Sequence, residues 1–287
     1  MKFNPKDSQQ ESTAAIMQER KLSAITVPCS DLPSGGLPYD SGAEISYLPY
    51  TFGDLKTLSQ SKVKTQTLYE YLLQGIITSF DKMELTFPDF LYVSLLRKIS
   101  SIGTSQFKFE VTCNRCGKKH TQVSSIDKVE FTDLYDKVPE LPAVVTMQGK
   151  DIALSPTTIG SLLELYKLGK IDEDSADVIL EASHAVFAQQ IISINGKEVP
   201  FDDRYEFIQN INWEDYGVIK EVDALFQHGI KPIILTCDGV IAQERHMGGK
   251  KTPCGAVLEV SLDRLHSQLQ PFREHQESAS GRIRFGK

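Results

Sequence analysis

The residues with the clearest chemical potential are four cysteines that occur as two separated pairs. Cys113 and Cys116 form a Cys-x-x-Cys-Gly sequence between two predicted strands, and Cys237 and Cys254 border predicted strands later in the chain. Two thiolates at a tight turn lie close enough to share a metal ion, and a structural zinc site needs four ligands. We therefore predict that these four cysteines bind one structural zinc ion.

The second pair departs from the compact spacing, because sixteen residues separate Cys237 from Cys254. A degenerate ribbon without metal is therefore the alternative to a zinc site. His120 and His246 are candidate substitute ligands, although we expect each to be a solvated loop histidine. Cys29 has no partner in the sequence pattern and is expected to be a small apolar filler.

Nothing in the sequence matches a catalytic constellation, so we expect a protein that is not an enzyme. Residues 248–252 do not satisfy the Gly-x4-Gly-Lys-Ser/Thr phosphate loop, and residues 32–36 lack the Gly-x-Ser-x-Gly elbow of a hydrolase. The acidic runs at 172–174 and 202–203 stand at predicted helix starts, where they complement the helix dipole. His184 lies in an apolar helical stretch and is expected to be packed there.

The cysteines depend for their positions on a helix–strand–Cys–strand unit that occurs twice. In the first copy, residues 86–89 predict a helix start, because Thr86 can cap the helix and Pro88 fits its first turn. The helix is predicted to stop at Gly103, and the alternating residues 106–112 predict a strand that leads into Cys113. A second strand is expected around residues 120–124.

The second copy repeats this order. Asn212 is the predicted helix cap and Gly229 the predicted stop, followed by a strand over residues 232–236 that leads into Cys237. Cys254 then precedes an alternating strand over residues 256–263. If the two hairpins face each other, their four thiolates close one tetrahedral site.

The remaining elements are short helices and hairpins. They comprise a strand at 44–48, a helix at 65–76, a hairpin at 143–154, three helices at 157–168, 174–191 and 202–211, and a turn at 195–196. Segregated helices with short antiparallel hairpins predict an α+β fold, with a zinc-ribbon-like element formed by the two cysteine hairpins.

We expect five segments along the chain. They are a polar N-terminal arm (1–25), a first αβ half with the Cys-x-x-Cys hairpin (26–135), a helical insertion (136–211), a second αβ half with the split cysteine pair (212–265) and a polar tail (266–287). The tail closes on the basic and apolar residues 282–287, which predict either a solvated terminus or a docking peptide for a neighbouring subunit.

Charge and hydropathy exclude several classes of protein. The chain has 287 residues, with 31 Lys and Arg against 38 Asp and Glu, which gives a net charge of −7. This acidic balance disfavours nucleic acid as a partner. The apolar runs are too short to span a bilayer, and the first residues lack the apolar stretch of a signal peptide. We expect a soluble protein made inside a cell, without membrane contact.

Several motifs in their order resemble one known family. They are Leu-Pro-Ser-Gly-Gly-Leu-Pro-Tyr at 32–39, the strand and following residues at 47–55, Leu-Thr-Phe-Pro-Asp-Phe at 85–90, the Cys-x-x-Cys-Gly sequence and His-Gly-Ile at 228–230. Over residues 32–262 this pattern resembles the baseplate hub assembly proteins of contractile-tailed (T-even-like) bacteriophages. The departure is the second cysteine pair, where that family would have a compact Cys-x-x-Cys.

The resemblance implies a non-enzymatic structural or assembly protein of the phage baseplate or hub. Its partners would be other baseplate or hub proteins, in the context of an oligomeric ring. It would act in the host cytoplasm during assembly and in the tail baseplate of the virion. The alternative is a cytosolic zinc-ribbon adaptor that binds nucleic acid, because Lys118-Lys119-His120 and Lys250-Lys251 lie beside the cysteines and could contact phosphates.

Overall fold

A computed structural model describes residues 23–51, 53–54, 64–103, 106–171, 179–242 and 251–260. Several predicted features lie outside these residues: most of the N-terminal arm, the tail, the acidic run at 172–174, His246 and most of the loop at 248–252.

The first part of the body is a small antiparallel sheet covered by two helices. Its strands, in spatial order, are β1 (Ile25–Val27), β2 (Ile45–Tyr47) and β3 (Ile76–Thr78). Helices α3 (Thr65–Gln74) and α4 (Phe87–Ile102) supply apolar side chains that pack with those of the sheet. Leu72 and Phe90 are completely buried in this core.

Helix α4 begins and ends where the sequence predicts. The Thr86 hydroxyl accepts a hydrogen bond from the Asp89 backbone N–H at 3.3 Å, which satisfies one of the free donors of the first turn. Gly103 ends the helix in the left-handed conformation, with φ of 70°. Asp89, in the first turn of the helix, also contacts a distant segment, because its completely buried carboxylate accepts hydrogen bonds from the Ser34 N–H and the Tyr39 hydroxyl.

The second part of the body contains a three-stranded antiparallel sheet and most of the remaining helices. The strands are β7 (Ala143–Met147), β8 (Lys150–Leu154) and β9 (Ile191–Ile194), and the helices are α6 (Ile179–Gln190), α7 (Phe201–Gln209) and α8 (Trp213–Phe226). Helix α5 (Ile159–Lys167) follows β8 in the sequence but packs in the first core. The predicted turns are present, because Gln148 and Asn195 adopt positive φ before Gly149 and Gly196.

Helix α8 is shorter than predicted. Asn212 caps it by accepting from the Asp215 backbone N–H at 2.9 Å, as expected. The helix ends at Phe226, however, because Gly229 belongs to strand β10 (Gly229–Ile230), which pairs with β6 (Phe131–Thr132). Strand pairing with a distant segment therefore overrides the local helix-stop signal of the glycine.

A separate module consists of two hairpins that carry the cysteines. The first hairpin is β4 (Gln106–Thr112) with β5 (Lys119–Ser125), and the second is β11 (Ile233–Thr236) with β14 (Val257–Val260). Between β11 and β14 the chain forms an additional ladder of β12 (Val240–Ala242) and β13 (Lys251–Pro253). We call these six strands the two-hairpin module.

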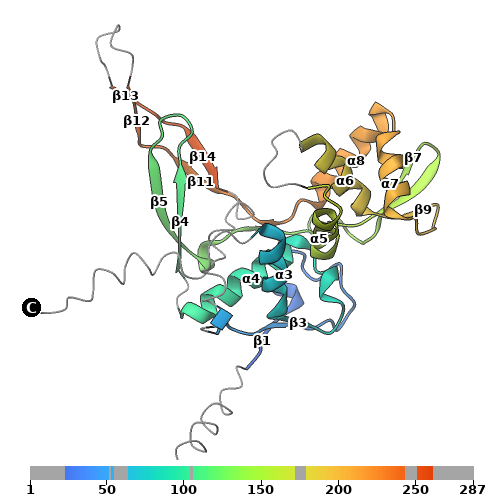
Figure 1. Ribbon diagram of the computed structural model, residues 1–287, viewed down its shortest axis with the longest axis horizontal. Helices are drawn as coiled ribbons and strands as arrows, with labels where there is room; N and C mark the ends of the chain where they lie inside the picture. The colour runs from blue at the N-terminus through green and yellow to red at the C-terminus, as the bar shows by residue number, and fades with distance from the viewer. Residues whose placement is uncertain are drawn as a thin grey trace, which may run out of the picture.

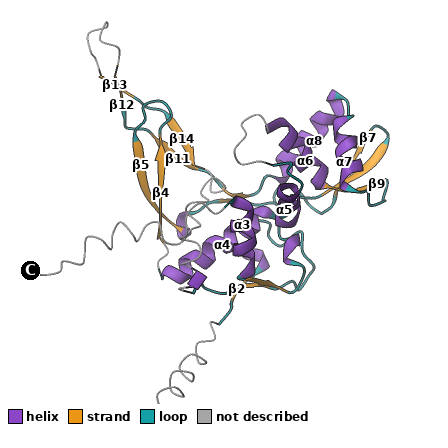
Figure 2. Cartoon of the chain, in the orientation of Figure 1, coloured by secondary structure: helices purple, strands orange, loops and turns teal. Residues whose placement is uncertain are grey.

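The three parts have separate cores. One core lies among α3, α4, α5 and the first sheet, the second among α6, α7, α8 and the second sheet, and the third inside the two-hairpin module. Figure 1 shows the module projecting from the body, with the β4–β5 hairpin beside the β11–β14 hairpin although the two are distant in sequence. Figure 2 shows that helices dominate the body and that the module is made of strands. The molecule is therefore α+β, as predicted.

Candidate metal centre

The first hairpin holds Cys113 and Cys116 in a compact turn. The Cys113 backbone N–H donates to the Lys118 carbonyl, and the Gly117 N–H donates back to the Cys113 carbonyl, both at 2.8 Å. Gly117 has a φ of 72°, a conformation that side chains with a Cβ rarely adopt. This turn directs both cysteines to the same end of the hairpin.

The second hairpin reproduces the same backbone pattern with an insertion. The Cys237 N–H donates to the Ala256 carbonyl at 2.8 Å, and the Gly255 N–H donates to the Cys237 carbonyl at 3.1 Å. Gly255 has a φ of 58°, and it follows Cys254 as Gly117 follows Cys116. The two cysteine turns are therefore equivalent, with the ladder of β12 and β13 inserted between the two cysteines of the second.

The two turns face each other and bring the four sulfur atoms together. The Sγ atoms of Cys113 and Cys254 are 3.7 Å apart, and those of Cys116 and Cys237 are 3.5 Å apart. All four Sγ atoms lie within 4.8 Å of one another. Ligands of a tetrahedral zinc ion at ~2.3 Å from each sulfur would be ~3.8 Å apart, so the cluster has the dimensions of such a site.

The inner faces of the hairpins position this cluster. Cys113, Cys237 and Cys254 are buried together with Leu258, and Val111 packs against them. Because side chains alternate along a strand, the residues of one face of each hairpin form this small core. The core holds the two turns against each other with few apolar residues.

The thiols of the cluster differ in their acidity. Backbone hydrogen bonds from Cys116 and Arg115 help to lower the pKa of Cys113 to about 7. Burial raises the pKa of Cys237 to about 12, although a hydrogen bond from the Gly239 N–H acts to lower it. A backbone hydrogen bond from Ala256 acts to lower the pKa of Cys254, but burial and the sulfurs of Cys113 and Cys116 together raise it. Four adjacent thiolates repel one another, so a divalent cation would be needed to deprotonate the whole set.

His120 is not the solvated loop histidine that the sequence suggested. It lies on β5 with 9 % of its surface exposed, because strand pairing directs its ring toward the second hairpin. Its Nε2 is 3.2 Å from the Cys237 Sγ, and its Nδ1 is 3.4 Å from the Asp238 carboxylate, which also accepts from Lys118. A carboxylate–histidine–sulfur arrangement of this kind orients a metal ligand from outside.

Sequence reasoning missed three residues around the cluster. The Arg115 guanidinium donates to the Cys254 carbonyl at 3.1 Å, which links the two turns. The Gly239 N–H donates to the Cys237 Sγ at 3.3 Å, and a Cβ on Gly239 would lie only 2.5 Å from the Cys116 Sγ. Asp238 is the third. A signal was present, since Asp238 and Gly239 follow Cys237 as Asn114 and Arg115 follow Cys113.

A second group of sequence motifs meets in the body. His228 Nδ1 donates to the Phe226 carbonyl at 2.7 Å, which leaves Nε2 to accept from the Thr86 hydroxyl at 3.2 Å. The Thr86 N–H donates to the Tyr39 hydroxyl at 3.0 Å, and Tyr39 donates to Asp89 at 2.6 Å. Three motifs that are far apart in the sequence, at 32–39, 85–90 and 228–230, therefore form one hydrogen-bonded network.

The chain matches one known protein family. Residues 24–239 match the family model described as T4 bacteriophage base plate protein. This range contains the network of Tyr39, Thr86, Asp89 and His228, as well as three of the four cysteines. The chain belongs to this family. Membership indicates a structural role in the baseplate of a phage tail, among other baseplate proteins.

The family match covers residues 24–239 and leaves the end of the second hairpin outside it. No curated protein and no solved structure gives a significant match. Cys254 and strand β14 lie beyond the residues that match the base plate family, so half of the second cysteine turn is outside the shared region. Among the described residues, no helix combines the length and the apolar character that crossing a membrane requires.

Proposed function

We propose that this base plate family member is a non-enzymatic component of the baseplate hub, acting as a structural subunit or an assembly factor through protein–protein contacts. The observation that supports this most strongly is the family match over residues 24–239. Within the described residues, four cysteines form one cluster of titratable groups, and Tyr39, Asp89 and His228 belong to the hydrogen-bonded network of the body. Contacts with neighbouring subunits in a ring, during assembly in the host cytoplasm and in the tail, are part of the proposal.

We further propose that Cys113, Cys116, Cys237 and Cys254 bind one zinc ion with a structural role. The support is the spacing of their sulfurs, the equivalence of the two turns and the all-thiolate ligand set, which suits zinc in closed tetrahedral sites. With all four positions filled by protein, the ion would have no open position for a substrate. Its role would be to fix one hairpin against the other.

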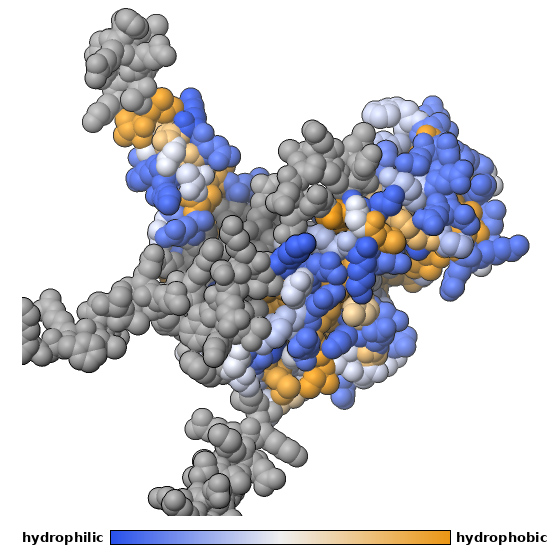
Figure 3. Space-filling view, viewed as in Figure 1, coloured by the Kyte–Doolittle hydropathy of each residue, from blue (hydrophilic) through white to orange (hydrophobic). Residues whose placement is uncertain are grey.

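Exposed apolar side chains on the module support a role in protein contacts. Val123, Ile234 and Val257 are 60 %, 69 % and 69 % exposed, respectively, and they lie on the outer faces of the hairpins. Figure 3 shows apolar surface on the projecting module as well as on the body. Apolar surface on an element that projects from the molecule is typical of a region that contacts other proteins.

The nucleic-acid alternative receives less support from the local contacts. Lys118 is ion-paired with Asp238 at 2.7 Å, and His120 is buried against Cys237, so both of these groups are already engaged. Lys250 lies outside the described residues. Lys118 and His120 are therefore occupied by contacts within the module, and we propose that nucleic acid is not a partner.

Deleting the gene in a phage tests the proposed hub role. We expect hosts infected with the deletion phage to accumulate capsids without complete tails, because a tail that lacks a hub component would not be completed. Electron microscopy of lysates gives the counts of capsids and tails, with the gene supplied from a plasmid as the control. Normal contractile tails in the absence of the protein would contradict the proposal. If the protein is required for tails, mass spectrometry of tails purified from the natural phage distinguishes a retained subunit from an assembly factor.

A further inference from the structure

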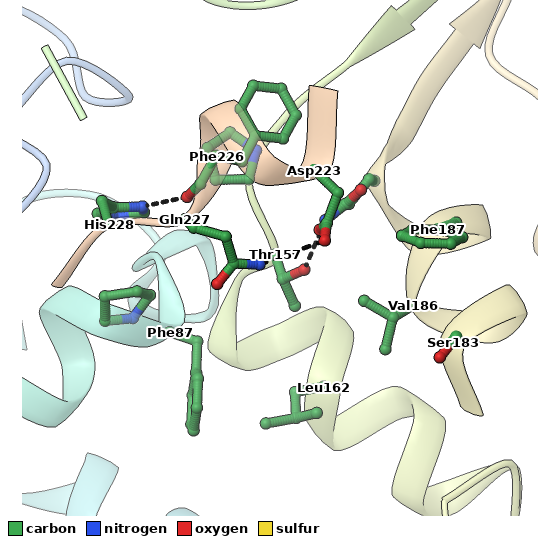
Figure 4. Close-up of a pocket in the computed structure, with 13 residues that line it drawn as sticks. Phe87, Thr157, Leu162, Ser183, Val186, Phe187, Asp223, Phe226, Gln227 and His228 are labelled. Carbon is green, nitrogen blue, oxygen red and sulfur yellow. Dashed lines mark hydrogen bonds between the residues drawn. The ribbon is translucent and has the colours of Figure 1, made fainter. Parts of the chain in front are cut away.

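A cleft of about 530 Å³ lies between the two parts of the body. Figure 4 shows its walls, to which α4 contributes Phe87, α5 contributes Leu162, and α6 contributes Val186 and Phe187. Asp223 of α8 lies at the same cleft. An apolar cleft with a few polar groups is the usual form of a binding site.

The charge of Asp223 is not balanced by a cation among the described residues. Its carboxylate oxygens accept from the side-chain amides of Gln190, at 2.8 Å, and Gln227, at 3.2 Å, and it forms no ion pair within the described part of the chain. Amide donors fix the orientation of a carboxylate but leave its charge in place. The cleft therefore favours a ligand that has apolar side chains beside a cationic group.

We propose that the chain's own segment 282–287 binds in this cleft. The segment reads Arg-Ile-Arg-Phe-Gly-Lys, so it alternates guanidinium groups with an aliphatic and an aromatic side chain. Ile283 and Phe285 would contact the apolar walls, and an arginine would form a charge-assisted, two-point contact with Asp223. The inference goes beyond the proposed hub role, because it assigns an internal ligand to the cleft.

The point where the described chain ends makes this contact reachable. Val260, the last described residue, pairs with Ile233. Ile230 and Lys231, which closely precede Ile233 in the sequence, line a second cavity. This cavity shares Phe87, Gln227 and His228 with the cleft. The six residues from Gln227 to Ile233 span at most ~20 Å, whereas the 22 residues from Val260 to Arg282 can span ~75 Å. The tail is therefore several times longer than the path it has to cover.

Hydrogen exchange provides a direct test. The intact chain is compared with a chain that ends at residue 277, which retains every described residue. For a tethered segment with a Kd on the order of 0.1 mM and an effective concentration on the order of 1 mM, occupancy protects the site about tenfold. We expect amide exchange in residues 183–190 and 223–228 to be about tenfold faster in the shortened chain, with the β7–β8 hairpin unchanged.

Two charge variants sharpen the test. Arg282→Glu with Arg284→Glu, in the intact chain, should reproduce the effect of shortening, whereas Arg273→Glu, in the same tail, should not. Asp223→Asn keeps the shape and an acceptor oxygen at the cleft and should also accelerate exchange, whereas Asp203→Asn on the exposed surface of α7 should not. Adding a synthetic peptide of residues 278–287 to the shortened chain should restore protection at sub-millimolar concentration.

Equal exchange in the intact and shortened chains would overturn the proposal. So would accelerated exchange in Arg273→Glu equal to that in the double arginine variant, because the effect would then be non-specific. Protection that grows with protein concentration would show that the segment of a second copy fills the cleft, and it would overturn the assignment to the chain's own tail.

Discussion

The sulfur cluster shows how single residues of this protein act through their backbone as well as their side chains. The Cys113 and Cys237 N–H groups each close a turn, and Gly117 and Gly255 supply the left-handed conformation that completes it. Once the two turns face each other, the cysteine side chains bring their Sγ atoms to 3.7 and 3.5 Å from one another. This is why an isolated CxxC and a widely split pair can place four sulfurs at one point.

The first prediction concerns zinc content. Protein purified without chelator should contain about one zinc per chain, and Cys113→Ser should lower both zinc content and Tm, because the ion would lose a thiolate ligand and link the hairpins less firmly. Atomic absorption and thermal unfolding measure the two quantities. Cys29→Ser is the matched control, since Cys29 packs in the first core and its thiol donates to the Ala43 carbonyl, away from the cluster. Zinc-free protein with a Tm unaffected by Cys113→Ser would show that the cysteines only pack together.

His228 gives the second prediction, which concerns pH. Burial lowers the pKa of His228, and Lys137 adds to the shift, while the Phe226 carbonyl and Asp89 oppose it. The folded protein therefore binds this proton less readily than the unfolded chain does. The contribution of the neutral imidazole to stability is complete above the unfolded pKa of about 6.5 and is lost as the pH falls toward the lower folded value.

Urea unfolding between pH 7.5 and pH 5.5 measures this effect. The free energy of unfolding should fall with decreasing pH in the natural chain, and His228→Asn should make the slope shallower, because asparagine does not titrate. The asparagine amide can still donate to the Phe226 carbonyl, so the variant is expected to fold. An identical slope in both proteins would contradict the prediction.

At the scale of elements, helix α4 connects the parts of the body. Its first turn bonds to the segment around Ser34 and to His228, and its middle carries the buried Arg97. The Arg97 guanidinium donates to the Leu48 and Leu72 carbonyls and lies 4.0 Å from the centre of the Tyr50 ring. Through Arg97, helix α4 is therefore hydrogen-bonded to the residue that follows strand β2 and to helix α3.

The third prediction concerns the packing of the Arg97 guanidinium against Gly75. Gly75 ends α3 directly beside Arg97, and a Cβ there would overlap the guanidinium. Gly75→Ala should therefore destabilise the protein by about 2 kcal/mol, the cost of overfilling a packed site. Gly217→Ala, within α8, is the control: a Cβ there meets no atom within 4 Å, so the substitution should stabilise by up to about 1 kcal/mol. Chemical denaturation gives both values, and equal effects at the two sites would refute the explanation.

The division into two αβ halves around a helical insertion remains a prediction. Packing crosses those boundaries, since Ile159 and Leu163 of α5 lie in the first core, while Ile219 and Val222 of α8 lie in the second. Helix α5 of the predicted insertion therefore packs in the first core, and helix α8 of the predicted second half packs in the second core. The core of the two-hairpin module, by contrast, consists of residues from that module.

At the scale of the whole molecule, the acidic net charge sets the fourth prediction. With a net charge of −7 and with Lys118 already ion-paired, the chain should not bind DNA or RNA tightly in 50 mM salt. A gel-shift titration at increasing salt measures this directly. Affinity that falls steeply as salt rises would favour the nucleic-acid adaptor instead.

The sequence alone determined the local features of this protein. The helix starts at Thr86 and Asn212 and the turns at 148–149 and 195–196 follow from hydrogen bonds and φ angles within a few residues. The resemblance to phage baseplate proteins was likewise carried by short motifs, and the family match confirms it. Such features need no knowledge of distant contacts, because their energetics are local.

Only the tertiary structure decided which distant residues meet. The end of α8 at Phe226 depends on the pairing of β10 with β6, and the burial of His120 depends on the second hairpin covering its face of β5. The convergence of the four sulfurs has the same origin, since Val111 and Leu258 pack only when the hairpins face each other. Packing between segments about a hundred residues apart or more depends on shape and burial across the whole chain, which no local spacing encodes.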